Sequence, residues 1–260
     1  MTLDRTPLAA LAAFALLACG SDAQEEAPAD AGTTTMTEAE IAEIVRRTIA
    51  ENPELIIETV DRHFEAQALA EAAATEDQAA ALIPALARGE SGHAMGAPLD
   101  QAEVVVIEFF DYHCGYCKRA ADFTLDLARE DGVRVVLQDL PILREESRDA
   151  AIAGLAAAES GVYPDFHRAL MRTGGVLDRG ALEAAARRAG APGVVALLND
   201  EAVVARLGAK VDRSAEAARA LRLDGTPAFL IARPDGSGAT IVPGYGPEQV
   251  REAMAALRAD

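Results

Sequence analysis

Two cysteines three residues apart, Cys114 and Cys117, are the side chains of this sequence best suited to chemistry. An apolar, β-branched run at 104–110 precedes them and is typical of a strand buried on both faces. The segment from Lys118 onward is predicted to be a helix. A Cys-x-x-Cys pair between a central strand and a helix indicates a thiol–disulfide redox site.

The position of this pair at a helix N-terminus predicts different tasks for the two thiols. Unpaired backbone N–H groups and the positive end of the helix dipole favour a thiolate, so the pKa of Cys114 is expected to fall below the ordinary value of about 8.5. Cys114 is then the attacking nucleophile, and Cys117, one turn along, is the resolving thiol. Gly115 and Tyr116 set the space and the N–H donors around Cys114, and through them the redox poise.

Metal binding is the alternative use of two thiols. A structural zinc site needs four ligands, but the sequence has only one further cysteine, Cys19, and His63, His93 and His167 lack ligand spacing. A Cu(I) site needs fewer soft ligands, so a copper-binding or copper-sequestering module built on the same pair stays open. The redox chemistry itself calls for no metal and no cofactor.

The composition indicates a folded domain with an acidic surface. The chain has 260 residues, of which 50% are hydrophobic, and a formal net charge of −18. This length allows one large domain, or one domain with an extension. No basic stripe is present to neutralise phosphates, so nucleic acid is not an expected partner.

The N-terminus carries an export signal. An apolar run from Leu8 to Ala18 follows Arg5 and is too short to span a bilayer as a mature helix. Because small residues lead into Cys19, residues 1–18 resemble a bacterial lipoprotein signal, in which Cys19 would be lipidated. The alternative is an ordinary cleaved secretory signal. Both predict an exported, periplasmic chain, held to a membrane only through a lipid anchor, in a compartment where disulfides form.

Residues 36–92 are predicted to form a helical oligomerisation arm, which follows a disordered tether at 19–35. A capping box at 37–40 starts a first amphipathic helix. A second helix begins at Pro53, and Pro84 is expected to bend or end it. Two such helices cannot bury their apolar faces alone. We therefore expect the arm to pack on copies of itself, with packing on the main domain of the same chain as the alternative.

Residues 93–260 are predicted to form an α/β domain. A strand at 104–110, the helix after the cysteines and a strand at 133–137 imply a right-handed parallel crossover. Helical periodicity then continues through an insertion at about 145–221. The remaining predicted elements are a hairpin around the turn at 234–238 and a helix at 247–258.

Several stretches carry a resemblance to a known family. Phe-Phe-Asp-Tyr-His-Cys-Gly-Tyr-Cys-Lys at 109–118, the helical insertion and Gly-Thr-Pro-Ala-Phe at 225–229 resemble the DsbA-like branch of the thioredoxin superfamily. The arm with Glu-Asn-Pro-Glu at 51–54, together with Cys-Gly-Tyr-Cys, is closer to the ScsC-like, copper-resistance-associated members. The resemblance extends from about residue 96 to the C-terminus and implies a thioredoxin-like fold with a helical insertion.

The resemblance also implies supporting roles around the cysteines. Pro227 would be a cis-proline facing the active site, with the backbone of Thr226 pairing with a substrate strand. Glu108 would be the buried acid below the cysteines, whose raised pKa suits it to relay a proton for Cys117. His113 would either stabilise the Cys114 thiolate as an imidazolium or point to solvent.

Two functions follow from these residues. The first is an exported thiol–disulfide oxidoreductase that acts on proteins with cysteines and is reset by a membrane redox partner. Among its modes, the self-associating arm favours disulfide isomerase or reductase, with a DsbA-type oxidase as the alternative. ScsC-like relatives are expected to form trimers through such an arm. The second function is the copper-binding module.

Overall fold

The computed structural model describes residues 36–259, so the predicted signal, the tether and Cys19 lie outside the described residues. The chain divides into two compact units, the first ending at Glu58 and the second beginning at Thr59. Within residues 36–259, no helix has the length and apolar character needed to cross a bilayer.

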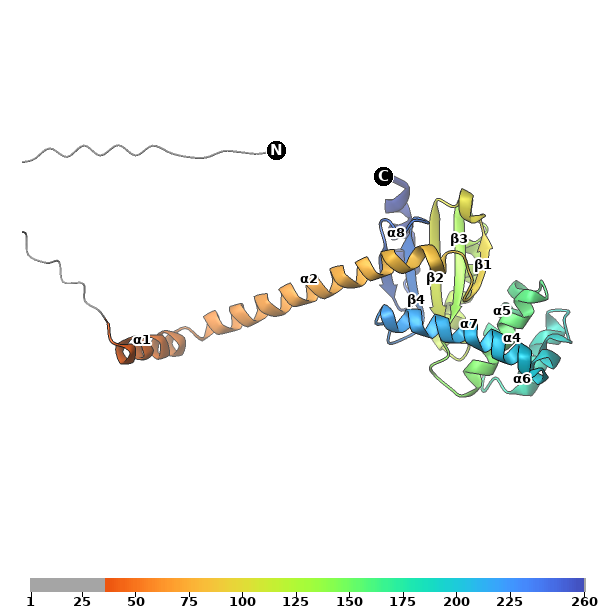
Figure 1. Cartoon of the computed structure of the whole chain (residues 1–260), viewed down its shortest axis with the longest axis horizontal. Helices are drawn as coiled ribbons and strands as arrows, with labels where there is room; N and C mark the ends of the chain where they lie inside the picture. The colour runs from red at the N-terminus through yellow and green to blue at the C-terminus, as the bar shows by residue number, and fades with distance from the viewer. Residues whose placement is uncertain (1–35, 260) are drawn as a thin grey trace, which may run out of the picture. The chain divides into compact units, whose positions relative to one another are not determined.

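The second unit is built on a five-stranded sheet of order β1-β3-β2-β4-β5 (Figure 1). Its strands are β1 (His93–Gly96), β2 (Val104–Phe110), β3 (Val133–Asp139), β4 (Ala228–Ala232) and β5 (Thr240–Pro243). Strands β2 and β3 are parallel, and the other pairs are antiparallel. All seven residues of β2 are buried, which confirms the predicted strand with two covered faces.

The helices confirm the predicted α/β architecture. The first unit holds α1 (Glu38–Glu51) and the start of α2 (Pro53–Leu86), and α3 (Gly115–Leu127) joins β2 to β3. Between β3 and β4 lies the helical insertion. It comprises α4 (Glu146–Glu159), α5 (Tyr163–Met171), α6 (Arg179–Arg188) and α7 (Glu201–Ala220), and α8 (Pro247–Ala259) ends the described chain.

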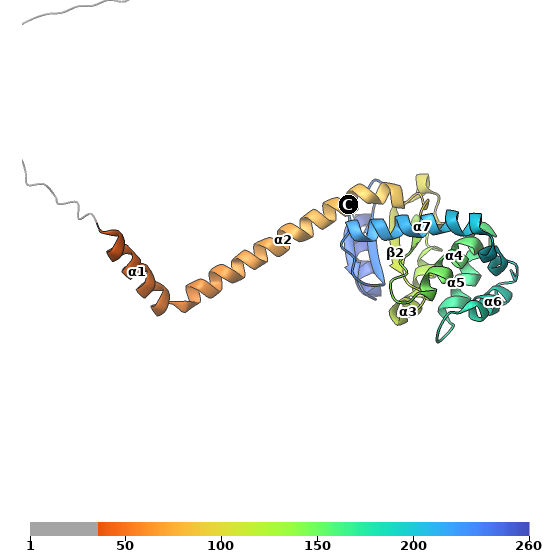
Figure 2. The ribbon, with the colours of Figure 1, turned by 60° about the horizontal axis from the view of Figure 1, so that its bottom comes forward.

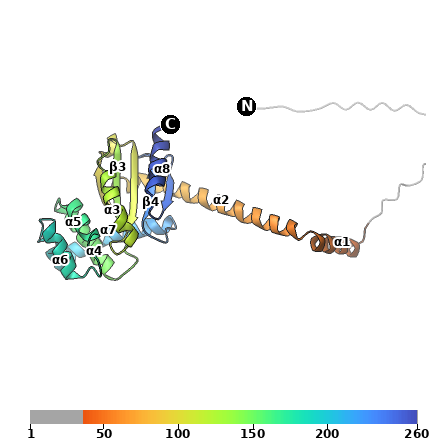
Figure 3. The same ribbon diagram turned by 180° about the vertical axis from the view of Figure 1, so that it is seen from behind.

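Helices cover both faces of the sheet. On one face, α3, α8 and the insertion form the larger core, and α3 and α8 lie in front of the strands when the domain is seen from behind (Figure 3). On the other face, the end of α7 and the last turns of α2 form a second core (Figure 2). The active-site cysteines belong to the first core and reach it from the N-terminus of α3.

The end of α2 belongs to the domain, which corrects the predicted boundary between an arm at 36–92 and a domain starting at 93. Ala79 and Ile83 are fully buried, and Leu86 is 5% exposed. Their apolar side chains pack against the face of the sheet that carries Val105, Ile107 and Phe109. The compact unit therefore includes residues well before 93, because the second face of the sheet needs this helix as its cover.

Pro84 lies inside α2, which continues to Leu86. A proline has no N–H to donate to the carbonyl four residues earlier, here Ala80. That carbonyl approaches Gly236 in the β4–β5 turn, where a Cβ would lie 2.1 Å from the Ala80 oxygen. Gly236 has a φ of +90°, so glycine is required there both by the backbone and by the contact.

Helix α1 has the predicted capping box and no buried residue. The Thr37 hydroxyl accepts from the Glu40 N–H, and the Glu40 carboxylate accepts from the Thr37 N–H. Ile41, Ile44 and Ile49 are nevertheless 45–49% exposed. Local sequence thus determines this helix, while its apolar stripe has no cover within the described chain.

Candidate active site

Cys114 is the N-cap residue of α3. Its Sγ accepts a hydrogen bond from the backbone N–H of Cys117 at 3.5 Å, while its own N–H donates to the Asp111 carbonyl at 2.9 Å. Both cysteines are free thiols, and Cys114 is 6% exposed whereas Cys117 is fully buried. The more accessible sulfur thus lies where the N–H groups of the first helical turn converge, as expected for the attacking thiol.

Hydrogen bonding lowers the pKa of the Cys114 thiol to about 5. The largest contribution comes from the Cys117 side chain, followed by Thr226 and by the backbone N–H groups of Cys117 and Tyr116, and burial opposes them. A hydrogen bond donated to the Cys114 sulfur, such as that from the Cys117 N–H, stabilises the thiolate more than the neutral thiol. Cys114 is therefore a thiolate at neutral pH.

We expect thiolate absorbance near 240 nm in the reduced protein to rise with a midpoint near pH 5. Because the folded pKa lies below the unfolded value of about 8.5, this thiolate stabilises the reduced fold above pH 5, with the full gain reached above the unfolded pKa. The Cys114→Ser variant is the control and should lack the transition. A midpoint near pH 9 would contradict the assignment.

Cys117 has the opposite environment. Burial raises its pKa well above the ordinary value, and the neighbouring Cys114 and Glu108 add to the shift. A neutral, buried thiol does not compete for external disulfides. It becomes a nucleophile only when a mixed disulfide on Cys114 has removed the adjacent negative charge and a base has taken its proton.

Glu108 lies in β2 on the face of the sheet that carries Phe110. It is 1% exposed, and neither carboxyl oxygen has a hydrogen-bond partner among the described residues. Burial raises its pKa to about 8. The carboxyl group is thus mainly neutral at pH 7 yet titrates close to it, which suits exchange of a proton with Cys117.

The loop before β4 brings Thr226 and Pro227 to Cys114. The Thr226–Pro227 bond is cis, as the resemblance implies. In its thiol form, the Sγ of Cys114 donates to the Thr226 carbonyl at 3.1 Å. These residues are 112 positions apart in sequence, and the pairing of β2 with β4 brings them together.

Asp111 is a positioning residue that the sequence analysis missed. It is 2% exposed. One carboxylate oxygen accepts from the N–H of His113 at 2.7 Å and the hydroxyl of Ser147 at 2.8 Å; the other accepts from the N–H groups of Ile142 and Leu143, both at 2.9 Å. Asp111 thereby ties the active-site loop to the start of the insertion. Its place three residues before Cys114 was the only sequence signal.

His113 takes neither of its two predicted roles. Its Nδ1 lies 2.8 Å from the Ser147 hydroxyl, and its Nε2 accepts from the Leu177 N–H at 3.0 Å. The side chain is 3% exposed, so it does not point to solvent. Burial lowers its pKa, which disfavours an imidazolium beside Cys114. His113 instead links the active-site loop to two segments of the insertion.

The two residues between the cysteines face outward. A side chain at Gly115 would meet nothing within 4 Å, and Tyr116 is 57% exposed. The Arg119 guanidinium lies 4.1 Å from the centre of the Tyr116 ring. Lys118 donates to the Thr173 carbonyl, which ties α3 to the end of α5. The surface beside Cys114 is therefore open and carries an aromatic ring.

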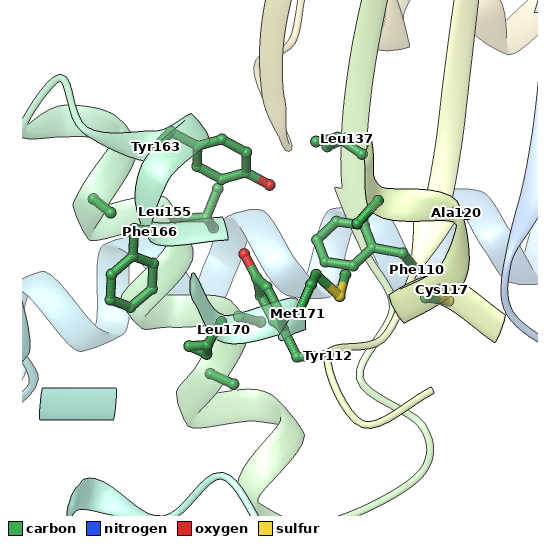
Figure 4. Close-up of a cluster of buried hydrophobic side chains, with 14 of the residues drawn as sticks. Phe110, Tyr112, Cys117, Ala120, Leu137, Leu155, Tyr163, Phe166, Leu170 and Met171 are labelled. Carbon is green, nitrogen blue, oxygen red and sulfur yellow. The ribbon is translucent and has the colours of Figure 1, made fainter. Parts of the chain in front are cut away.

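The insertion packs directly behind the active-site loop (Figure 4). Phe110 and Tyr112 face Tyr163, Phe166 and Leu170 of α5 in one continuous core. The Tyr112 hydroxyl lies 3.1 Å from Nδ1 of His167, and both residues are 1% exposed. The insertion thus holds the segment that leads into Cys114 in one conformation.

The site combines a thiol of lowered pKa at a helix N-terminus, a buried second thiol, and a cis-proline loop that contacts the first sulfur. On this sheet, these features define the class of thioredoxin-fold thiol–disulfide oxidoreductases. The sequence profile of the DSBA-like thioredoxin domain matches residues 105–255. The chain therefore belongs to the DsbA-like thioredoxin family.

Solved structures place it beside the ScsC-like members of that family. Proteus mirabilis ScsC with a linker deletion is 26% identical, with a TM-score of 0.61, and the match covers 88% of this chain and 99% of that one. The catalytic domain of the same protein is 25% identical over 71% of this chain and 99% of its own, with a TM-score of 0.60. A thioredoxin-like oxidoreductase from Silicibacter pomeroyi is 31% identical over 67% and 96%, with a TM-score of 0.56.

A search of the curated proteins found no match. Among residues 36–259, no three or more His, Cys, Asp or Glu side chains gather in a way that could hold a metal ion.

Proposed function

We propose that the chain is an exported protein disulfide isomerase that works through Cys114 and Cys117. The Cys114 thiolate attacks one sulfur of a substrate disulfide; that S–S bond breaks, a mixed disulfide forms, and the other substrate sulfur leaves as a thiolate. A different substrate thiolate then attacks the mixed disulfide and releases the Cys114 thiolate. The substrate exchanges one disulfide for another, with no net oxidation.

Cys117 provides a second way to resolve the mixed disulfide. With the ionised form of Glu108 as the proton acceptor, Cys117 attacks the Cys114 sulfur, which releases the substrate as a dithiol and leaves a Cys114–Cys117 disulfide. The substrate is then reduced and the protein oxidised, so a membrane dithiol partner must return the pair to its reduced form. Because the Cys114 thiolate is stabilised, the disulfide form is easily reduced, which favours oxidase or isomerase over strong reductase activity.

The observation that favours an isomerase over an oxidase is the uncovered apolar stripe of the helical arm. Its members in α1 are Ile41, Ile44, Val45 and Ile49, and those in α2 are Ile56, Ile57, Val60, Phe64 and Leu69, with exposures from 43% to 72%. Such a stripe at helical spacing fits self-association, because identical helices can cover one another. A homo-oligomer, expected to be a trimer, would present several active sites to one misfolded chain.

We expect the full chain to restore activity to scrambled ribonuclease, and a chain that begins at Ala70 to lose this isomerase activity while still forming disulfides in reduced ribonuclease. The shortened chain keeps Ala79, Ile83 and Leu86, which the second core needs. Light scattering should show an oligomer for the full chain and a monomer for the shortened one.

The matched variants place aspartate on the arm. Ile44→Asp disrupts the stripe, whereas Arg47→Asp changes an exposed polar position of the same helix. The first is expected to dissociate the oligomer and the second to preserve it. If the Ala70 chain keeps the parent mass per particle, or isomerises as well as the parent, the arm is not the element that makes an isomerase.

A further inference from the structure

A cleft of about 470 Å³ lies in the helical insertion and is lined by three arginines. Arg168 and Arg172 come from the end of α5, and Arg188 is the last residue of α6. Helix α5 packs against both α3 and α6 (Figure 3). The thiol–disulfide chemistry described above uses none of these arginine side chains. The other lining residues are Asp165, Ala169 and Thr173.

Two carboxylates neutralise part of the positive charge of the cleft. Asp122 of α3 lies 3.2 Å from Arg168 and 3.2 Å from Arg172. Asp165 lies 3.5 Å from Arg168. Arg168 is therefore held between two acids, and its side chain is only 25% exposed. This arginine builds the wall of the cleft and has little left to offer a ligand.

Arg172 and Arg188 keep hydrogen-bond donors for a ligand. Arg188 donates through Nη2 to the Thr173 hydroxyl at 2.9 Å and pairs with no carboxylate among residues 36–259. Within the same residues, Arg172 contacts Asp122 through Nη2 alone. A guanidinium has five N–H donors in a fork that matches a carboxylate. Three guanidinium groups against two carboxylates leave a surplus positive charge, on a chain whose net charge is −18.

Two contacts connect the cleft to the active site. Lys118 lies one turn after Cys114 in α3, and its ammonium donates to the Thr173 carbonyl. Leu177, four residues after Thr173, donates its N–H to the His113 ring. Helix α3 rises about 6 Å from Cys114 to Lys118, and the lysine side chain spans the rest of the way. At about 3.4 Å per residue, an extended substrate would reach from a mixed disulfide to the cleft in about three to five residues.

We propose that Arg172 and Arg188 form a subsite for the carboxylate of a glutamate or aspartate about three to five residues from the reacting cysteine of a substrate protein. The inference rests on the proposed thiol–disulfide exchange and adds its substrate class: disulfides with an acidic residue at that spacing. The net charge of −18 repels acidic segments at long range. An acidic residue can therefore be favoured only where a local positive site receives it.

The test follows oxidation of the reduced full-length protein by symmetric peptide disulfides. Each peptide has one cysteine and a single glutamate at one of the positions up to about six residues before or after it, and a matched peptide has glutamine there. We expect glutamate about three to five residues from the cysteine, on one side, to raise the second-order rate constant roughly fivefold over glutamine, the upper range for one exposed ion pair. Added salt should remove this advantage.

Three variants and a control locate the effect. Arg172→Gln and Arg188→Gln each remove one guanidinium, and each should remove most of the advantage. Arg187→Gln, at the neighbouring exposed arginine of α6 outside the cleft, changes the net charge equally and should keep the advantage. Arg188→Glu should reverse the preference, so that lysine at the same peptide position reacts faster than glutamate. All variants should react with the glutamine peptides at the parent rate, which shows that the redox site is intact.

Glutamate without effect at every position, an equal effect at all positions, or an advantage that survives in both Arg172→Gln and Arg188→Gln would overturn the subsite alone. Equal loss in Arg187→Gln would show long-range attraction in place of a site, with the same consequence. Failure of the parent protein to react with any of the glutamine peptides would overturn the proposed exchange, and the subsite with it.

Discussion

Cys114→Ser is expected to reduce disulfide exchange to the uncatalysed rate, whereas Cys117→Ser is expected to accumulate mixed disulfides with substrate proteins. With a pKa of about 5, Cys114 is about 99% thiolate at pH 7, compared with a few per cent for a free cysteine. A serine hydroxyl supplies no comparable nucleophile. Cys117→Ser keeps the attacking sulfur and removes only the internal attack that releases the substrate.

The two variants control for each other, since each changes one sulfur to oxygen in the same turn of α3. The measurement is non-reducing electrophoresis after acid trapping, together with the rate of exchange on a peptide disulfide. The Cys117→Ser adducts should disappear on addition of dithiothreitol. Adducts on Cys117 in the Cys114→Ser protein would mean that the buried thiol is the attacking one, against the assigned roles.

Glu108→Gln is expected to remove a destabilising contribution that grows as pH rises from 4.5 to 8, and to slow release of mixed disulfides. Burial raises the folded-state pKa of Glu108 from 4.5 to about 8, so the native state binds a proton that the unfolded state has lost between these pH values. The contribution of Glu108 to the stability of the fold therefore decreases as pH rises from 4.5 to 8, opposite in sign to that of the Cys114 thiolate. The cost at pH 7 is about 3 kcal/mol, because each pH unit in this window contributes about 1.4 kcal/mol.

The measurement is urea unfolding of the reduced proteins at several pH values. The free energy of unfolding of the Glu108→Gln variant should increase relative to that of the parent as pH rises from 5 to 8. Glu103→Gln, at an exposed acid just before β2, is the control and should follow the parent. Parallel curves for parent and Glu108→Gln would show that the carboxyl group does not titrate in this range.

The same variant tests the proton transfer. Without a carboxylate to accept the proton of Cys117, attack on the mixed disulfide should slow, while the first attack by Cys114 should keep its rate. An unchanged release rate in Glu108→Gln would show that Glu108 takes no part in the attack of Cys117 on the mixed disulfide. Glu108 would then be a buried acid that only lowers the stability of the fold.

The sequence alone predicted the two reactive thiols and the strand and helix that position them, because these signals are local. The Cys-x-x-Cys spacing, the apolar run of β2 and the helix after it place both thiols at a helix N-terminus with no need for distant contacts. The capping box of α1 is likewise complete within four residues. The resemblance at Thr226 and Pro227 added the cis-proline loop, which sequence spacing cannot place against Cys114.

Only the tertiary structure decided how the loop around Cys114 is held and where the domain begins. Asp111, Ser147 and Leu177 meet at His113 across as many as 64 residues, and nothing in their local sequence marks them as partners. The end of α2 joins the domain because the second face of the sheet needs an apolar cover, although its amphipathic pattern is that of an arm. Local backbone preferences act over a few residues, whereas burial is shared among segments that only the completed fold brings together.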